Sequence, residues 1–227
     1  MKKPSGNVSR TAGERFVSDP ELASDMDPAL VVGGVIGEIN SSMKRLKAIC
    51  DAELISKAAD IIRKARLVYI FGAGASALAA QDLYQKLIRI GFPCTNTVDA
   101  RLQITSACSL KKGDAAFIVS CSGEIQEMIS CARIARKKGA SIITLTTETE
   151  NTLGALADAA LRVPFRERIG RTGSAAVSLI NQIAVNDMIY FMLISKNPEQ
   201  AMRALNETTA AAHYQEGENS AGFGGLH

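Results

Sequence analysis

The sequence lacks tryptophan, and aromatic residues make up only 5% of it. This scarcity argues against an aromatic stacking platform for single-stranded nucleic acid. It has two histidines and no C-x-x-C pair, so no zinc-ligand spacing is present, and we expect neither a metal nor a cofactor. The five cysteines, at positions 50, 94, 108, 121 and 131, are odd in number, which favours a reducing, cytoplasmic compartment over a disulfide framework.

Neither sign of charge dominates. The chain has 26 basic and 23 acidic residues and a formal net charge of +3, too balanced to indicate a nucleic-acid or membrane surface. No apolar run approaches the roughly 18 residues that a membrane span needs. The two N-terminal lysines are not followed by the apolar stretch of a secretory signal. The sequence therefore predicts a cytoplasmic protein with no membrane partner.

The two ends of the chain differ in composition from its middle. Residues 1–27 carry prolines and glycines with few apolar residues, and residues 215–227 are Gly-rich and aperiodic. We predict a flexible lead-in over 1–27, a helical segment over 28–66, a main α/β domain over 67–214 and a disordered tail over 215–227. The 227 residues suffice for one such domain with a substantial core.

An apolar stripe marks the first helix of the 28–66 segment. Its members alternate in spacings of four and three along the sequence: Val32, Ile36, Ile39, Met43, Leu46 and Cys50. A second helix follows, with Asp51 as its N-cap. Two interpretations are open. The pair is either a helical hairpin that packs on the next domain, which we favour, or part of a coiled coil, for which three heptads are too few to be diagnostic.

From residue 67 onward, short apolar runs alternate with amphipathic helices. Strands are predicted at Leu67–Phe71, Pro93–Val98, Asp114–Ser120, Ser141–Leu145 and Ala159–Val163. Helices are predicted near 76–90, 99–108, 123–138, 152–157 and 175–195, and a last helix opens at Pro198. This alternation predicts a three-layer α/β fold, in which helices cover both faces of a five-stranded parallel sheet.

Two loops that could bind an anion follow the first and third predicted strands. The first reads Gly72-Ala73-Gly74-Ala75-Ser76, and the second reads Ser120-Cys121-Ser122-Gly123. Glycines let backbone amides approach an anion, a helix N-terminus adds partial positive charge, and serine hydroxyls can donate hydrogen bonds. The first loop also fits a dinucleotide pattern, but no acidic residue follows about 20 positions later. Loops after these two strands meet at the switch point of a parallel sheet, which makes the pair more specific than either alone.

These loops belong to stretches that resemble a known family. The stretches read YIFGAGASALAAQDLYQKLIRIG, DARLQ and IVSCSGEIQE, and they resemble the sugar isomerase (SIS) fold, in particular the effector domain of RpiR/MurR-type transcription regulators. The resemblance spans residues 30–205 and implies a flavodoxin-like strand order, a homodimer or homotetramer, and a phosphorylated sugar as ligand. It also implies that the phosphate is held by Ser76, Ser120 and Ser122 with the amides of the glycine loops, at Gly72, Gly74 and Gly123.

The sequence departs from the family pattern in three places. Ile125 stands where members have Thr in S-x-S-G-x-T-x-E, and the lost hydroxyl could weaken binding by about 1 kcal/mol or more. Ile125 also fits the apolar face of its helix. Arg101 replaces a common His in D-A-H-L-Q. Two interpretations are open: its guanidinium makes bidentate hydrogen bonds to the phosphate or to a sugar acid, or it is a solvated surface residue. The regulators carry a helix-turn-helix domain where this chain has 27 residues, so direct DNA binding is not supported by the sequence.

The residues that could catalyse proton transfer are few. Glu124, Glu127 and His213 are the available types, and both glutamates begin a helix, where the dipole alone favours a carboxylate. An arginine cluster leaves the last strand and either attracts an anion or is a solvated loop: Arg162, Arg166, Arg168 and Arg171. We therefore favour a sensing module that binds a sugar phosphate without catalysis. The alternatives are an aldose–ketose phosphosugar isomerase and an oligomer whose site has decayed, and fold alone does not choose among them.

Overall fold

The computed structural model describes the backbone of residues 27–164 and 174–221, and the side chains of 27–164 and 177–211. The predicted lead-in therefore lies almost wholly outside the described residues, as do Arg166, Arg168 and Arg171.

Five parallel strands form one sheet in the order β2-β1-β3-β4-β5, the flavodoxin-like order. The strands are β1 (Val68–Gly72), β2 (Cys94–Asn96), β3 (Ala115–Val119), β4 (Ser141–Thr147) and β5 (Ala159–Val163). All five predicted strands are confirmed, with bounds within two residues of those expected.

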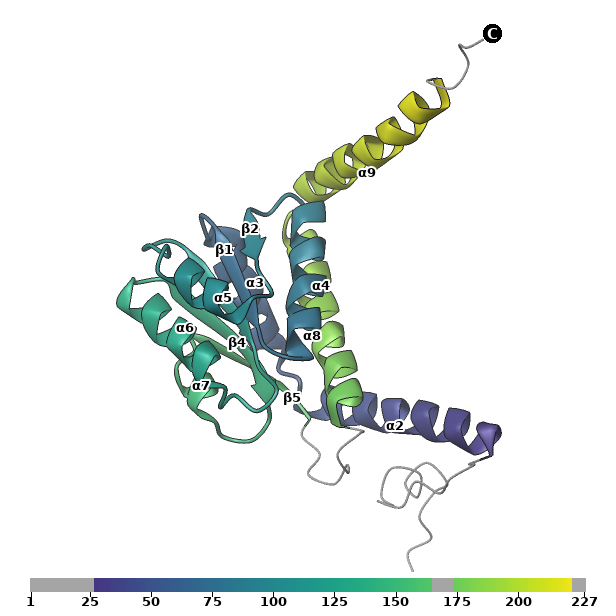
Figure 1. Cartoon of the computed structure of the whole chain (residues 1–227), viewed down its shortest axis with the longest axis vertical. Helices are drawn as coiled ribbons and strands as arrows, with labels where there is room; N and C mark the ends of the chain where they lie inside the picture. Colours follow the sequence, from purple (N-terminus) through teal and green to yellow (C-terminus); the bar gives the residue numbers. More distant parts are fainter. Residues whose placement is uncertain (1–26, 165–173, 222–227) are drawn as a thin grey trace, which may run out of the picture.

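Helices cover both faces of this sheet (Figure 1). One face is covered by α3 (Ala52–Lys64), α4 (Ser76–Arg89) and α8 (Ser174–Lys196), and the other by α5 (Ala100–Ala107), α6 (Gln126–Lys137) and α7 (Thr152–Ala155). Successive side chains of a strand enter opposite cores, as β1 illustrates with Val68 and Ile70 on one face and Tyr69 and Phe71 on the other. The predicted three-layer α/β fold is confirmed.

The predicted N-terminal helices are α2 (Pro28–Ile49) and α3. Asp51 caps α3 as predicted, since its carboxylate accepts hydrogen bonds from the amides of Glu53 and Leu54. Helix α3 packs along α8, whereas α2 begins away from the body and contacts the N-terminal end of α8 with its C-terminal part (Figure 1). Only the C-terminal part of the α2 stripe, from Met43 onward, packs against the core.

No uninterrupted apolar run in the sequence approaches 18 residues, but among the described residues one helix, α8, is long and apolar enough to cross a membrane by length and composition. The segment concerned is Val177–Lys196. However, Val185, Ile189 and Leu193 are buried in the core beside α3 and α4. A helix with protein packed along it carries the same apolar composition, so we interpret α8 as the central helix of this layer.

The last helix, α9 (Pro198–Ala221), begins at Pro198 as predicted but extends beyond residue 214, where the sequence predicted a disordered tail. The alanines just before that point are strong helix formers, and a single glycine at 217 does not end the helix. Figure 1 shows α9 leaving the body at the end opposite α2.

All five cysteines are free thiols. Burial raises the pKa of Cys94 to about 11 and that of Cys131 to about 12. These thiols are therefore protonated at neutral pH and behave as apolar side chains.

Candidate functional site

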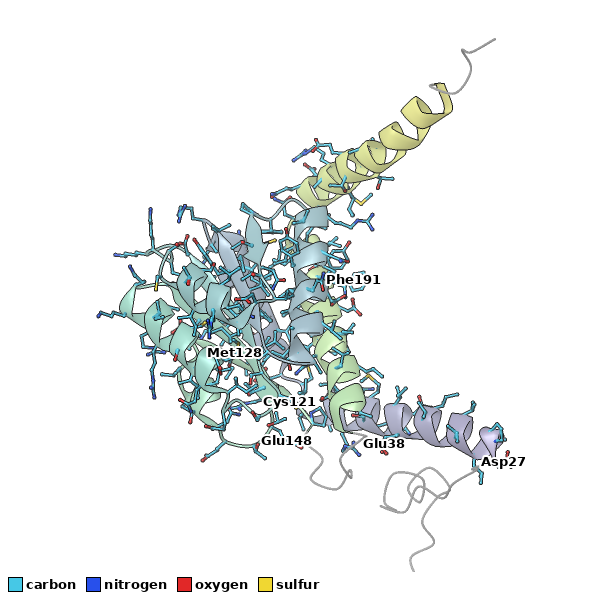
Figure 2. The ribbon with its side chains drawn as sticks, viewed as in Figure 1. Asp27, Glu38, Cys121, Met128, Glu148 and Phe191 are labelled. Carbon is cyan, nitrogen blue, oxygen red and sulfur yellow. The ribbon has the colours of Figure 1, made fainter. Side chains whose placement is uncertain are left out.

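The two predicted anion loops begin side by side at the C-terminal edge of the sheet. Gly72, the last residue of β1, is in register with Val119, the last residue of β3. Figure 2 shows Cys121, in the second loop, at the end of the sheet nearest α2. The helices that follow the loops, α4 and α6, have no side-chain cap at their first turns. This edge is also the topological switch point, where open parallel sheets bind ligands.

The first loop requires its two glycines for different reasons. A Cβ atom at Gly72 would lie 2.8 Å from the carbonyl oxygen of Ser76 and 2.9 Å from the Cβ of Ala80, so only glycine lets α4 return so closely over β1. Gly74 has a φ of +58°, a left-handed conformation that side chains other than glycine adopt at a cost. The loop backbone is therefore shaped by its glycines, as the sequence predicted.

A buried glutamine holds the start of this loop. The Oε1 atom of Gln103 accepts a hydrogen bond from the Gly72 amide at 3.0 Å, and its Nε2 donates to the Gly72 carbonyl at 2.9 Å. Strand β2 has ended by this point, because its last pair joins Asn96 to Ile70. The side-chain amide of Gln103 therefore replaces the missing strand. Sequence reasoning missed this role, although Gln103 closes the DARLQ stretch.

The three predicted serines present hydroxyl groups in three environments. Ser76 is buried, and its Oγ accepts a hydrogen bond from Nε2 of Gln182 at 3.1 Å. Ser120 is fully buried, and its Oγ has no hydrogen-bond partner within the described part of the chain. Ser122 is exposed, and its Oγ accepts from the Glu124 amide at 3.2 Å. In the described residues, each hydroxyl thus retains its own hydrogen for donation.

The second loop is tied to the segment between β4 and α7. The Glu124 carboxylate accepts hydrogen bonds from the amide and the hydroxyl of Thr152, at 2.7 and 2.8 Å, and these bonds lower the pKa of Glu124. Gly123 has a φ of +69°, and a Cβ there would overlap the Asn151 side chain. The loop is therefore fixed by contacts with residues that follow it by nearly thirty positions.

Arg162, the first member of the predicted arginine cluster, is engaged within the fold. Its Nη1 donates hydrogen bonds to the Thr146 hydroxyl and to the carbonyls of Thr147 and Thr149, at 3.0, 3.0 and 3.1 Å. Its guanidinium lies against Gly154, where a Cβ would be 2.8 Å from Nη2. Arg162 thus stabilises the β4–α7 segment. Its hydrogen bonds are made within the fold and give no support to the interpretation that it attracts an anion.

Two of the three departures from the family pattern, Arg101 and Ile125, occupy different surroundings. Arg101 is exposed in the first turn of α5, whose cap Asp99 accepts from the Leu102 amide at 2.8 Å. Both interpretations of Arg101, as a ligand group or a solvated residue, stay open. Ile125 precedes α6 and packs against the core on that face of the sheet. The packing agrees with the apolar interpretation of Ile125.

A groove of about 530 Å³ lies elsewhere, between α3 and the starts of β3 and β4. Its lining includes Asp60 and Asp114, which already pair with Lys196 and Arg66 at 3.0 and 2.9 Å. The groove is at the N-terminal edge of the sheet, away from the anion loops. Among the described residues, no three His, Cys, Asp or Glu side chains cluster as metal ligands.

Comparison with known proteins gives one family match and several relatives. Residues 61–192 match the SIS domain. The chain is 33% identical over 191 residues to an uncharacterized HTH-type transcriptional regulator of Caldanaerobacter subterraneus subsp. tengcongensis, covering 84% of this chain and 67% of that protein.

Solved structures similar to this one include a complex with a sugar phosphate, a domain of a transcription factor and an isomerase. The Vibrio vulnificus NanR protein complexed with ManNAc-6P superposes with a TM-score of 0.74 and 24% identity, over 82% of this chain and 74% of that one. The sugar isomerase domain of an RpiR transcription factor from Sphaerobacter thermophilus gives 0.69 and 23%, over 78% and 96%. A phosphoheptose isomerase from Francisella tularensis gives 0.61 and 15%, over 75% and 100%. At these identities the structures establish the shared fold alone.

Proposed function

Because the chain belongs to the SIS domain family, we propose that it binds a phosphorylated sugar at its two loops and acts as a sensing module. The observation that carries this proposal is the set of three serine hydroxyls at the switch point, on Ser76, Ser120 and Ser122, each with a hydrogen left to donate. At physiological pH the oxygens of a sugar phosphate act mainly as hydrogen-bond acceptors. Hydroxyl donors beside two helix N-termini without side-chain caps therefore suit this group.

Sensing is favoured over isomerisation by the state of the nearest carboxylate. An aldose–ketose isomerase needs a base to move a proton between adjacent carbons. Glu124 is occupied by two hydrogen bonds from Thr152, which lower its pKa and make it a weaker base. The NanR structure contains ManNAc-6P, which supports binding of a phosphosugar. The HTH-type relative is named as a regulator, which supports a regulatory role. We place the protein in the cytoplasm, where thiols stay reduced.

Thermal unfolding against a panel of phosphosugars tests the binding proposal. The panel contains ManNAc-6P and other hexosamine, muramic and pentose phosphates. We expect the melting temperature to rise with one of these compounds and not with the free sugars. In Ser122→Ala the rise should be lost at the same concentration, because a hydrogen bond to a charged group contributes about 1.5–3 kcal/mol, a roughly 10- to 100-fold change in affinity.

The matched control is Ser109→Ala, an exposed serine in the connection between α5 and β3. This variant should respond to the phosphosugar as the wild type does. A flat response of the wild type to every phosphosugar at millimolar concentration would contradict the proposal. Formation of the isomeric sugar from the binding compound would instead establish the isomerase alternative.

We also propose that the protein is a homo-oligomer, with α2 in the contact between copies. Val32, Val35 and Ile36 are 60%, 46% and 54% exposed on the part of α2 that leaves the body. Leu78 and Phe191, on the outer faces of α4 and α8, are 57% and 65% exposed, and Figure 2 shows Phe191 on that outer face. No charged residue falls between 28 and 37, so a second copy can cover the stripe without burying a charge.

Light scattering after size exclusion measures the assembly directly. We expect the wild type to have a multiple of 24.1 kDa and the double variant Val32→Lys/Ile36→Lys to have the mass of one chain, because each lysine would bury an unpaired charge. Ala48→Lys adds charge to an exposed position on the opposite side of α2 and should keep the wild-type mass. A monomeric wild type, or a double variant of unchanged mass, would refute this contact.

A further inference from the structure

Two adjacent buried amides on α8 contact segments that are far apart in the sequence. Nδ2 of Asn181 donates to the Ser42 hydroxyl on α2 at 2.7 Å, and Nε2 of Gln182 donates to the Ser76 hydroxyl in the first loop at 3.1 Å. Asn181 and Gln182 are each only 1% exposed, and Ser42 and Ser76 are also buried. Within the described residues these two hydrogen bonds are the contacts that fix the two hydroxyls.

The contact with Gln182 determines what Ser76 can offer to a ligand. A serine hydroxyl donates one hydrogen bond and accepts up to two. Because Gln182 supplies an N–H, the Ser76 oxygen acts as the acceptor, and its own hydrogen must point away from Gln182. Without that donor, the hydroxyl could turn its hydrogen toward the side-chain oxygen of the amide or rotate freely. A donor held in advance costs less entropy on binding than one that must be ordered.

We propose that Gln182 is a positioning residue of the anion site, which turns the Ser76 hydroxyl hydrogen toward the bound phosphate, and that Asn181 links this arrangement to α2. The inference rests on the proposed phosphosugar site. Gln182 is not in contact with the ligand and acts through Ser76. A bound anion then favours the orientation that Gln182 imposes, and any change in the packing of α2 that shifts Asn181 alters the affinity by linkage.

A double-mutant cycle separates positioning from a merely structural role. Gln182→Met removes the donor at similar volume, and titration calorimetry with ManNAc-6P, and with inorganic phosphate as the minimal probe, should show about tenfold weaker binding. In the Ser76→Ala background the same substitution should have no further effect, since the hydroxyl on which Gln182 acts is gone. Gln182→Glu offers an acceptor in place of the donor and should weaken binding more than Gln182→Met.

Asn186→Leu is the matched control. Asn186 is also a buried amide of α8, but its Nδ2 donates to the Ala79 carbonyl and to Asp82 at 2.8 and 2.9 Å, not to the loop. This variant should lose stability in urea and keep the wild-type affinity. If Gln182→Met is too unstable to titrate, Gln182→Glu enters the same cycle.

The outcomes distinguish this inference from the proposed function. A wild type that binds and a Gln182→Met variant of equal affinity would overturn the inference alone. The inference alone would also be overturned if Gln182→Met weakened binding by the same factor with Ser76 present and in the Ser76→Ala background. A wild type that binds neither ManNAc-6P nor any other phosphosugar overturns the proposed function, and the inference with it.

The link to α2 has its own readout. Hydrogen exchange of the amides around Ser42 should slow when a saturating phosphosugar is bound, because the ligand fixes Ser76, Gln182 and the adjoining Asn181. In Asn181→Leu this protection should disappear, and the affinity should change by the coupling that is lost, because linkage is reciprocal. Unchanged exchange in α2 upon ligand binding would overturn the link between the two segments.

Discussion

Replacing Gly123 with alanine is expected to weaken phosphosugar binding at least about 100-fold and to destabilise the protein by about 2–4 kcal/mol. Two costs add. An alanine at a φ of +69° is strained by about 1–2 kcal/mol, and its Cβ overlaps the Asn151 side chain. Asn151 cannot move aside freely, because its amide donates to Thr146 and Thr149 and accepts from the Gly154 amide. Each of these bonds contributes about 1 kcal/mol.

Gly113→Ala is the control that isolates the overlap. Gly113 has a φ of +90° and nothing within 4 Å of the place a Cβ would take, and it precedes β3 at the opposite edge of the sheet. Its variant should lose about 1–2 kcal/mol from strain alone and bind normally. Urea denaturation gives the two free energies of unfolding, and calorimetry gives the two affinities. Equal losses of stability in both variants, with binding retained, would contradict this prediction. They would mean that the Asn151 side chain moves aside without a loss of stability.

The fold was largely predictable because its signals are local. A parallel strand covered on both faces is apolar throughout, and the runs of β1 and β3, which are buried at every position, stand out between amphipathic helices. Prediction is weaker where local composition is compatible with two structures. The apolar length of α8 would suit a membrane or a core, and only its packing beside α3 and α4 decides. The end of α9 was misplaced because glycines in a polar, aperiodic stretch suggested disorder.

The candidate site was predictable in its loops but not in its supports. Glycines and serines at consecutive positions before a helix are a recognisable sign of an anion-binding loop. The residues that support these loops are not recognisable in this way, because they are distant in the sequence. Gln182 bonds to Ser76, which is 106 positions away, and Arg162 bonds to Thr146, which is 16 positions away. Such contacts follow from the three-dimensional arrangement of the strands, and an isolated glutamine or arginine has no sequence period that would reveal them.

Gln103→Leu is expected to destabilise the protein by about 2–4 kcal/mol and to weaken phosphosugar binding about tenfold. Leucine fills a similar volume but leaves the amide and carbonyl of Gly72 without the side-chain partners they have at 3.0 and 2.9 Å. Gly72 is itself buried, so each group loses its hydrogen bond without water to replace it. Strand β2 cannot take over, because its pairing with β1 ends at Ile70. The start of the first loop should therefore fray.

Urea denaturation and phosphosugar titration of the same preparation measure both effects. Gln85→Leu, at an exposed position on α4, makes the same chemical change where no buried partner is lost. It should alter the free energy of unfolding by less than about 0.5 kcal/mol. A Gln103→Leu variant as stable as Gln85→Leu would show that Gly72 finds other partners, and the loop would then owe its shape to its glycines rather than to Gln103. Loss of stability with full affinity would instead mean that Gln103 stabilises the edge of the sheet and has no effect on the anion site.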